Sequence, residues 1–465
     1  MKLFVNDKTF YQKVVNLAVP VVLQGMLTIG VNMIDTIMLG AYGEYQLAGS
    51  SLANEFINIF QIMSMGMGYG AAVLTAQYWG GQNIEKLKKT VTVMLRLCLA
   101  VSAIFSMITF LFPAQLMEIF TDDYQIVDKG ILYFRVSAFA YIPTGISLTL
   151  TAVLRSVQEV RLPFITSVIV FFVNIFLNWV FIFGNLGAPE LQITGAALGT
   201  LLSRIVEVGI IGGFFFFKDS KIGYRMRDLK MRCQDILHLY ISYCVPVLIS
   251  DTLLGLGNSV VSIVMGHIGA SFVAANAIVS QVTRMSTILT QGVSSSSGVI
   301  TGNSLGAGEK KKAYEQGKTF WALSIGLGIF AGITIILLCP VIINSFQLEE
   351  ETVKIARELM YAVAIMVVFQ SVQSVLTKGV LRGGGDTRFL MYADILFLWL
   401  VSIPLGILLG LVWHAPAFLI YVALKADWMI KSVWCSLRMI KGKWIDHCVY
   451  ADGAVKSNGL SFRKL

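Results

Sequence analysis

The first candidate for chemistry in the chain is a single carboxylate, Asp35, near the end of the apolar range 20–40. Gln24 and Thr28 share its helix face and Asn32 lies beside them, so a polar stripe runs along this stretch. An Asp inside a transmembrane helix costs about 2.5–3.5 kcal/mol if it faces lipid. We therefore predict that Asp35 faces the protein interior or a water-filled cavity, where it holds and releases a cation. The alternative is a hydrated acid at the membrane edge.

A second set of polar residues can complete such a site. Asn174 and Asn178 are four residues apart, so both amides lie on one helix face, and Thr200 lies on a polar face of the next apolar run. Carboxylate, amide and hydroxyl oxygens are hard ligands that suit a small cation. We predict a cation-binding site of Asp35, Asn174, Asn178 and Thr200. The alternative is that the amides are hydrogen-bonding links between helices.

Other polar residues within apolar runs are candidates for contact with a substrate. Asp251 falls near the middle of its run, with Asn258 seven residues further on the same face. Asp251 either faces substrate or forms an ion pair with Arg284, and a purely structural pair is the alternative. Tyr141 lies in a Pro-containing bend that lines a cavity or belongs to the core. The predicted substrate-cavity residues are Gln24, Asn32, Tyr141, Asp251, Asn258 and Arg284.

The composition indicates which elements must position these residues. Of 465 residues, 56% are hydrophobic and 14% are charged, whereas soluble domains carry about 25% charged residues. The chain is therefore predicted to be an all-α membrane protein. Twelve apolar runs are long enough to cross a bilayer as helices. They lie near 14–39, 46–79, 90–113, 127–151, 162–184, 193–217, 238–265, 270–302, 319–345, 355–380, 388–411 and 415–440.

The charged residues between the runs orient the chain. Alternate loops are basic, such as 86–89 and 310–312, and the loops between them are acidic or bare, such as 349–351. By the positive-inside rule both termini are cytoplasmic, which agrees with an even number of spans. The net charge of +9 is accounted for in this way, so it does not indicate nucleic-acid binding.

The two halves of the chain repeat each other. The shift that superimposes Pro20 on Pro246 also superimposes Asn32 on Asn258, Gly66 on Gly292 and Gly80 on Gly306. Six spans separate equivalent points, which predicts parallel repeats with the substrate path between them. The expected domains are an amino-terminal six-helix lobe (1–217), a cytoplasmic linker (218–237), a carboxy-terminal six-helix lobe (238–440) and a cytoplasmic tail (441–465). The two halves differ at Asp35, because the corresponding residue in the second half is Val261.

Several segments resemble the multidrug and toxic compound extrusion (MATE) transporters. They are VNMIDTIMLG, LAGSSLANEF, GMGYGAAVLTAQYWGGQN and VLRGGGDTRF. The resemblance implies a twelve-helix exporter whose two six-helix lobes form a V, with drug bound between or within the lobes and exchanged for inward sodium or protons. In one branch of that family the cation is held by a first-helix Asp, a fifth-helix Asn-x-x-x-Asp pair and a sixth-helix Thr. These positions match Asp35, Asn174 with Asn178, and Thr200, so the second acid is an amide here.

The predicted function is a cation-coupled antiporter, driven by protons or sodium, that exports amphipathic and often cationic drugs or toxic organic compounds. The alternative is a flippase for a lipid-linked saccharide or another amphiphile, which would be expected to carry more cationic residues facing its cavity. No His/Glu metal set or Ser/Lys dyad lies within the runs, so we expect no enzyme activity, no cofactor, and no metal beyond a sodium ion at the cation site. The six cysteines are expected to be unpaired. We expect a monomer in the plasma or inner membrane, without a nucleic-acid partner.

The predicted topology can be tested by cysteine labelling. With an impermeant reagent on intact cells, a cysteine at Glu350 is expected to be labelled and a cysteine at Lys311 is expected to be protected, because the two positions lie on opposite sides of the membrane. The reverse pattern would overturn the topology.

Overall fold

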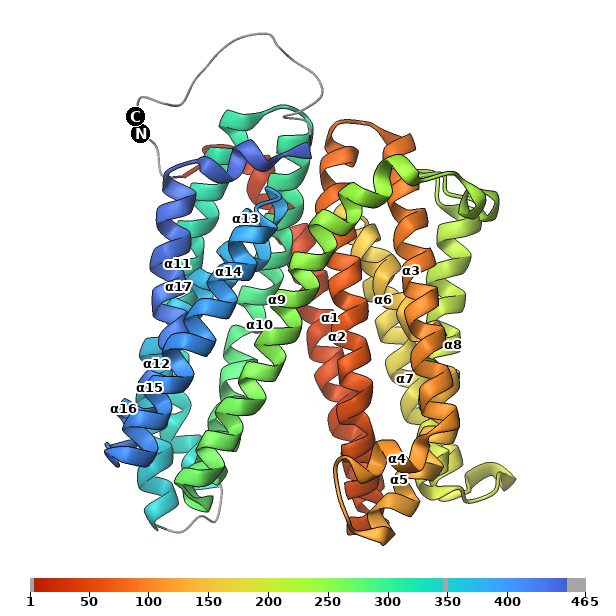
Figure 1. The fold of residues 1–465 in the computed structure, drawn as a ribbon, viewed down its shortest axis with the longest axis vertical. Coiled ribbons are helices and arrows are strands. Elements are labelled where there is room, and N and C mark those ends of the chain that lie inside the picture. Colours follow the sequence, from red (N-terminus) through yellow and green to blue (C-terminus); the bar gives the residue numbers. More distant parts are fainter. Residues whose placement is uncertain (1–3, 346–349, 450–465) are drawn as a thin grey trace. The chain divides into compact units, whose positions relative to one another are not determined.

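The computed structural model describes residues 4–345 and 350–449, and every element within these ranges is helical. The long helices of each part of the chain run alongside one another (Figure 1). The α-helices are α1 (Lys8–Gly40), α2 (Glu44–Gly80), α3 (Ile84–Leu111), α4 (Pro113–Glu118), α5 (Tyr124–Ser137), α6 (Tyr141–Ser156), α7 (Arg161–Phe183), α8 (Gln192–Gly213), α9 (Gln234–Ile268), α10 (Ala270–Gly306), α11 (Lys310–Ser345), α12 (Glu350–Val375), α13 (Leu381–Gly383), α14 (Thr387–Phe397), α15 (Ile403–Ile407), α16 (Ala417–Leu424) and α17 (Ala426–Ile440). Short 3-10 turns are η1 (Ala138–Ala140), η2 (Asn185–Gly187), η4 (Met226–Lys230) and η8 (Lys443–His447), and π-helical turns are η3 (Phe214–Lys218), η5 (Leu376–Val380), η6 (Leu398–Ser402) and η7 (Leu408–Val412).

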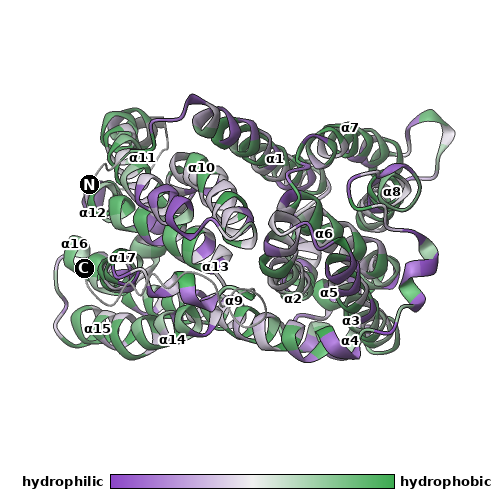
Figure 2. Ribbon diagram, turned by 90° about the horizontal axis from the view of Figure 1, so that it is seen from above, coloured by the Kyte–Doolittle hydropathy of each residue, from purple (hydrophilic) through white to green (hydrophobic). Residues whose placement is uncertain are grey.

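The predicted membrane spans correspond to these helices. Among the described residues, ten helices or helix pairs are long and apolar enough to cross a membrane. The other two predicted spans coincide with α10, which is rich in Ser and Thr, and with α16–α17, which is interrupted at Lys425. Viewed from above, α7, α14 and α15 are predominantly hydrophobic (Figure 2), as expected for helices in contact with lipid. The protein is a multi-pass membrane protein, and its six cysteines are buried free thiols as predicted.

The helices form two compact units, which we treat separately. The amino-terminal unit contains Val15–Ala72 and Ile84–Val260, and the carboxy-terminal unit contains Met1–Val14, Val73–Asn83 and Val261–Leu465. The division therefore falls inside α1, α2 and α9 and at the start of α3. The lobes predicted at 1–217 and 238–440, with a linker between them, stay a prediction.

In the amino-terminal unit, α8 is the central helix. α7 packs along it, and α5 and α6 also contact it. The core includes Met117, Phe134, Ile182 and Ala197, whose side chains are almost completely buried. Burial of such side chains contributes roughly 1.5–3 kcal/mol each for the larger ones. This packing brings the polar face of α7 against α8.

In the carboxy-terminal unit, α10, α11 and α12 contact one another, and α12 also packs against α16 and α17. The end of α2 joins this unit through a close crossing with α10. A Cβ on Gly80 would meet the carbonyl of Asn303, and a Cβ on Gly306 would meet the carbonyl of Gln77. In the sequence repeat, Gln77 corresponds to Asn303 and Gly80 corresponds to Gly306. The contact is therefore reciprocal, and at each position a glycine allows the backbones to approach.

The beginning of the predicted cytoplasmic tail belongs to the carboxy-terminal unit. Trp444 is fully buried, and the Val449 backbone N–H donates to Oε1 of Gln77 at 2.9 Å. The remainder of the tail, 450–465, and Glu349 of the predicted outward acidic loop lie outside the described residues.

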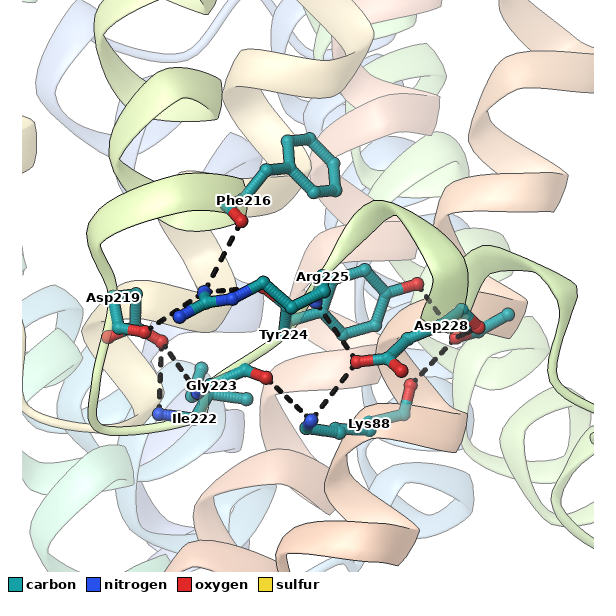
Figure 3. Close-up of polar contacts among 9 residues, drawn as sticks. Lys88, Phe216, Asp219, Ile222, Gly223, Tyr224, Arg225 and Asp228 are labelled. Carbon is teal, nitrogen blue, oxygen red and sulfur yellow. Dashed lines mark hydrogen bonds and ion pairs between the residues drawn. The ribbon is translucent and has the colours of Figure 1, made fainter.

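The segment predicted as a linker is folded against α3. The buried carboxylate of Asp219 accepts the backbone N–H groups of Lys221 (3.1 Å), Ile222 (2.9 Å) and Gly223 (3.2 Å). The Lys88 ammonium of α3 donates to the Gly223 carbonyl at 2.6 Å. These contacts close a tight turn, which Figure 3 shows beside the Lys88 side chain.

Tyr224 and Asp228 extend this attachment. The Tyr224 hydroxyl lies 2.8 Å from Oγ1 of Thr92, and burial raises its pKa to about 12, so it stays protonated at neutral pH. Asp228 forms an ion pair with Lys88 at 3.0 Å. Burial acts to raise the pKa of Asp228, but the Arg225 N–H and the Lys88 ammonium outweigh it and hold the pKa below its ordinary value. The linker is thus a strap on the amino-terminal unit.

Asp219→Ala is expected to release this strap. Three backbone N–H groups would lose their acceptor, at a cost of about 1–3 kcal/mol for the buried groups, so trypsin should cleave the purified protein faster within 218–232. The matched control is Asp122→Ala, at an exposed position. Equal cleavage rates for the two variants would contradict this account of the strap.

Candidate cation site

Three of the four predicted cation-site residues meet in the amino-terminal unit. Asp35 lies in the last turns of α1, and Asn174 and Asn178 lie one turn apart on α7. The Asn178 Nδ2 group donates to Oδ1 of Asp35 at 2.5 Å and to Oδ1 of Asn174 at 3.3 Å. Both amides are at least 98% buried. The acid and the two amides therefore form one hydrogen-bonded cluster between α1 and α7.

The amide oxygen of Asn178 is the exception in this cluster. It is buried and has no hydrogen-bond partner among the described residues. Gly199 of α8 packs directly on this oxygen, so that a Cβ at position 199 would clash with it. A buried acceptor without a donor costs about 1–3 kcal/mol. This unsatisfied oxygen is compatible with the predicted cation site, which stays a prediction.

Arg204 and Glu207 of α8 belong to the electrostatic surroundings of Asp35. Arg204 forms an ion pair with Glu207 at 2.7 Å, as the sequence predicts for residues three apart on a helix. Arg204 also acts electrostatically on Asp35, although no ion pair of Asp35 occurs in the described part of the chain. The carboxylate of Asp35 thus keeps a charge that is balanced only from a distance.

Thr200 directly follows Gly199 on α8 and is partly exposed. Within residues 4–345 and 350–449, the groups that act directly on Asp35 are Asn178 and Arg204, and Thr200 is not one of them. Its assignment to the site stays a prediction. Tyr133 of α5 is a nearby group that sequence reasoning missed: it is buried, interacts electrostatically with Asp35 and hydrogen bonds to Asn54 and Ser137.

Gln24 and Asn32, the other predicted residues on α1, differ in their surroundings. Oε1 of Gln24 accepts a hydrogen bond from the guanidinium of Arg155, in the last turn of α6, so the contact ties α1 to α6. Asn32 is exposed on the helix surface. Arg155 is not among the residues that the sequence analysis predicted for the site.

Tyr141 lies in the interior of the amino-terminal unit. It is 2% exposed, its ring packs on Phe60 with centroids 4.8 Å apart, and its hydroxyl accepts from Thr109 at 3.1 Å. These contacts support the core alternative for this residue and give no support to contact with a substrate.

Asp251, Asn258 and Arg284 are the remaining predicted cavity residues. Asp251 is partly exposed and Asn258 exposed on α9 in the amino-terminal unit, whereas Arg284 is exposed on α10 in the carboxy-terminal unit. Their roles as substrate contacts, and a pairing of Asp251 with Arg284, stay predictions.

The fold is that of a multi-pass helical membrane protein with an acid–amide cluster between α1 and α7. The profile of the MatE family matches residues 20–180 and 246–408, so the chain belongs to this family of multidrug and toxic compound extrusion transporters. The two matches begin at Pro20 and Pro246, which are equivalent positions in the predicted repeat. The resemblance read from the sequence motifs is confirmed.

Individual relatives agree over almost the whole chain. The chain is 24% identical to the probable multidrug resistance protein NorM of Thermotoga maritima over 452 residues, which covers 96% of each chain. It is 21% identical to the uncharacterized transporter YisQ of Bacillus subtilis, over 94% of this chain and 96% of the relative. A mutant of the Vibrio cholerae MATE transporter VcmN superimposes with a TM-score of 0.85 at 14% identity, covering 93% of this chain and 98% of that chain. The predicted two-lobe helical fold is confirmed.

Asn178→Leu is expected to destabilise the amino-terminal unit. The variant removes the hydrogen-bond donor of a charged, half-buried Asp35, a contact worth about 1.5–3 kcal/mol, so the unfolding temperature in detergent should fall. Asn32→Leu, on the same helix as Asp35 but exposed, should change stability by less than about 0.5 kcal/mol.

A double-mutant cycle identifies the cause. If the hydrogen bond to Asp35 is responsible, the destabilisation by Asn178→Leu should shrink in an Asp35→Asn background. An unchanged effect in that background would show that the amide stabilises the unit without Asp35.

Proposed function

We propose that this MATE-family transporter exports amphipathic, often cationic, organic compounds in exchange for a proton or sodium ion that binds at Asp35. The observation that carries the proposal is the cluster of the half-buried Asp35 carboxylate with two buried amides, in which the amide oxygen of Asn178 has no partner among the described residues. Burial disfavours an ionised carboxylate that lacks an ion pair. A proton or a sodium ion relieves that cost, so the site favours cation uptake.

In the structure, Asn178 donates a hydrogen bond to Asp35. A proton on Asp35 removes its charge, and the acid can then donate to an amide oxygen. A sodium ion instead takes the carboxylate oxygen and one or both amide oxygens as ligands. In either case the amide of Asn178 must turn, and the contact between α1 and α7 changes. Cation binding is therefore coupled to the position of α1.

The first helix can respond to this change because Pro20 lies inside α1. Proline lacks a backbone N–H and removes one helical hydrogen bond, which leaves a weak point in the helix. Bending of α1 at Pro20 would alter the surface that this helix offers to a substrate. Linkage then requires that bound substrate weaken cation binding by the same factor as the cation weakens substrate binding.

The names of the relatives support drug export over lipid flipping. The Thermotoga maritima relative is a probable multidrug resistance protein, and the Vibrio cholerae structure is that of a MATE transporter. A flippase for a lipid-linked saccharide remains the alternative class, and it would need cationic side chains at the substrate path.

Drug affinity should depend on the cation through Asp35. With purified protein in detergent, ethidium binding is expected to weaken by about 5- to 150-fold as either pH falls or sodium rises, the range of ordinary coupling energies. Asp35→Asn, which cannot take up a cation as a carboxylate, should abolish that dependence and also gradient-driven ethidium efflux from cells.

The matched control is Asp122→Asn, an exposed acid that should leave both binding and efflux unchanged. If neither cation weakens ethidium binding, or if the weakening persists in Asp35→Asn, the exchange mechanism at this site is wrong. Collapsing the sodium and proton gradients separately identifies the coupling ion.

A further inference from the structure

The strap of the amino-terminal unit, residues 218–232, carries an excess of positive charge. Its cations are Lys218, Lys221, Arg225, Arg227, Lys230 and Arg232, and its acids are Asp219 and Asp228. Asp219 accepts backbone N–H groups of its own turn, and Asp228 pairs with Lys88 of α3. Figure 3 shows both carboxylates joined to these partners. The acids of the strap therefore add little negative charge to its outer surface.

The acids that lie next to the strap are also paired. Glu159, between α6 and α7, forms an ion pair with Lys221 at 2.6 Å. Asp235, in the first turn of α9, and Glu85 of α3 each lie 3.0 Å from the ammonium of Lys89. These three acids already have a cation, and only one of those cations, Lys221, belongs to the strap.

Most cations of the strap lack an acidic partner. Lys218, Arg227, Lys230 and Arg232 are exposed and form no ion pair within residues 4–345 and 350–449. The guanidinium of Arg225 donates to three backbone carbonyls of η3 and the strap instead of to a carboxylate. The outer surface of the strap is therefore strongly positive.

The 3-10 turn η4 places two of these cations on one side. In a 3-10 helix, residues three apart lie above one another, so Arg227 and Lys230 share a face of η4. Asp228 of the same turn is held by Lys88. Met226, which precedes Arg227, is 56% exposed. The outer side of η4 thus offers two cations beside an apolar side chain.

The contacts with α3 hold the strap close to the membrane. Lys88, near the start of this membrane span, contacts the first half of the strap. Arg96, eight residues further along the span, donates to the carbonyls of Leu229 at 3.1 Å and Met231 at 2.9 Å. At about 1.5 Å per residue, the strap therefore extends roughly 12 Å along α3. The spans of α8 and α9 adjoin its two ends, so it lies beside the bilayer surface.

We propose that the outer face of η4, formed by Met226, Arg227 and Lys230, binds the anionic headgroups of membrane phospholipids. A guanidinium binds a phosphate through two parallel hydrogen bonds, and an ammonium attracts it as a point charge. Met226 adds apolar surface for the lipid chains. The predicted topology places the strap at the cytoplasmic leaflet, where anionic lipids attract basic segments next to membrane spans. The proposal does not depend on cation exchange at Asp35.

The competing explanation is a solvated loop whose cations only orient the chain. The positive-inside rule requires cations near the ends of spans but no fixed arrangement of them. In the strap, the acids are engaged and η4 is held against α3, so Arg227 and Lys230 are presented on a fixed surface. The two explanations differ in whether this pair binds anionic lipid more tightly than another exposed pair of cations does.

A double variant tests the surface. Purified full-length protein in neutral detergent is titrated with phosphatidylglycerol or with phosphatidylcholine, and bound lipid is counted by native mass spectrometry. The natural protein is expected to bind phosphatidylglycerol more tightly. Arg227→Gln together with Lys230→Gln should weaken that binding by roughly 30-fold, the usual effect of two cations near a membrane surface. Binding of phosphatidylcholine should not change.

The matched control is Lys354→Gln together with Arg357→Gln. This pair also combines a lysine and an arginine three residues apart, and both are exposed on α12. The control should bind phosphatidylglycerol as the natural protein does. Equal weakening in both double variants would show a general effect of net charge and would overturn the proposal. Equal binding of the two lipids by the natural protein would overturn it as well.

Inorganic phosphate separates a lipid surface from a site for a soluble anion. Phosphate and chloride at the same ionic strength are expected to displace phosphatidylglycerol equally, because screening acts on all charges alike. Stronger displacement by phosphate would show that the strap binds a free phosphate ion, and the proposal of a lipid surface would then be wrong.

Discussion

The absence of water inside the membrane is the constraint on which the rest of this structure depends. Backbone groups satisfy one another in helices, and each charged side chain at depth needs a partner from a neighbouring turn or helix. Arg204 and Glu207 meet that need within one helix, and Lys431 meets it between two. Within the described ranges, Asp35 has only an amide as a direct partner. This poorly compensated carboxylate is therefore the place where we propose that a cation binds.

Much of the fold can be predicted from the sequence because that constraint leaves a strong pattern. Apolar runs of sufficient length predict the twelve spans, and the constant shift between the two halves predicts the repeat. The pairing of Asn174 with Asn178 follows from helical periodicity, since both residues lie on one helix. The meeting of these amides with Asp35 was suggested by oxygen chemistry and the family resemblance, and the structure places the three side chains together.

The contacts that were missed join residues that are far apart in the chain and lie on no common helix. Arg155 reaches Gln24 across 131 positions, and Lys431 reaches Asp394 across 37. The spacing of Asp427 and Lys431, four apart in an apolar run, was a visible signal of a buried pair. The strap at Asp219 gave no such signal, because its polar sequence is equally typical of a solvated loop. The acid is identified as structural only when its three backbone donors are seen.

The crossing of α2 and α10 restricts how these two helices can move. Gly80 of α2 contacts the carbonyl of Asn303, and Gly306 of α10 contacts the carbonyl of Gln77. On each helix, the glycine and the contacted carbonyl are therefore three residues apart. If one helix slid along the other by a single residue, both glycines would lose these contacts at the same time. Residues with larger side chains would then face the two carbonyl groups and clash with them. The two helices can therefore part or pivot at this point, but they cannot change register. A transport cycle that uses this crossing must work as a hinge and not as a slide.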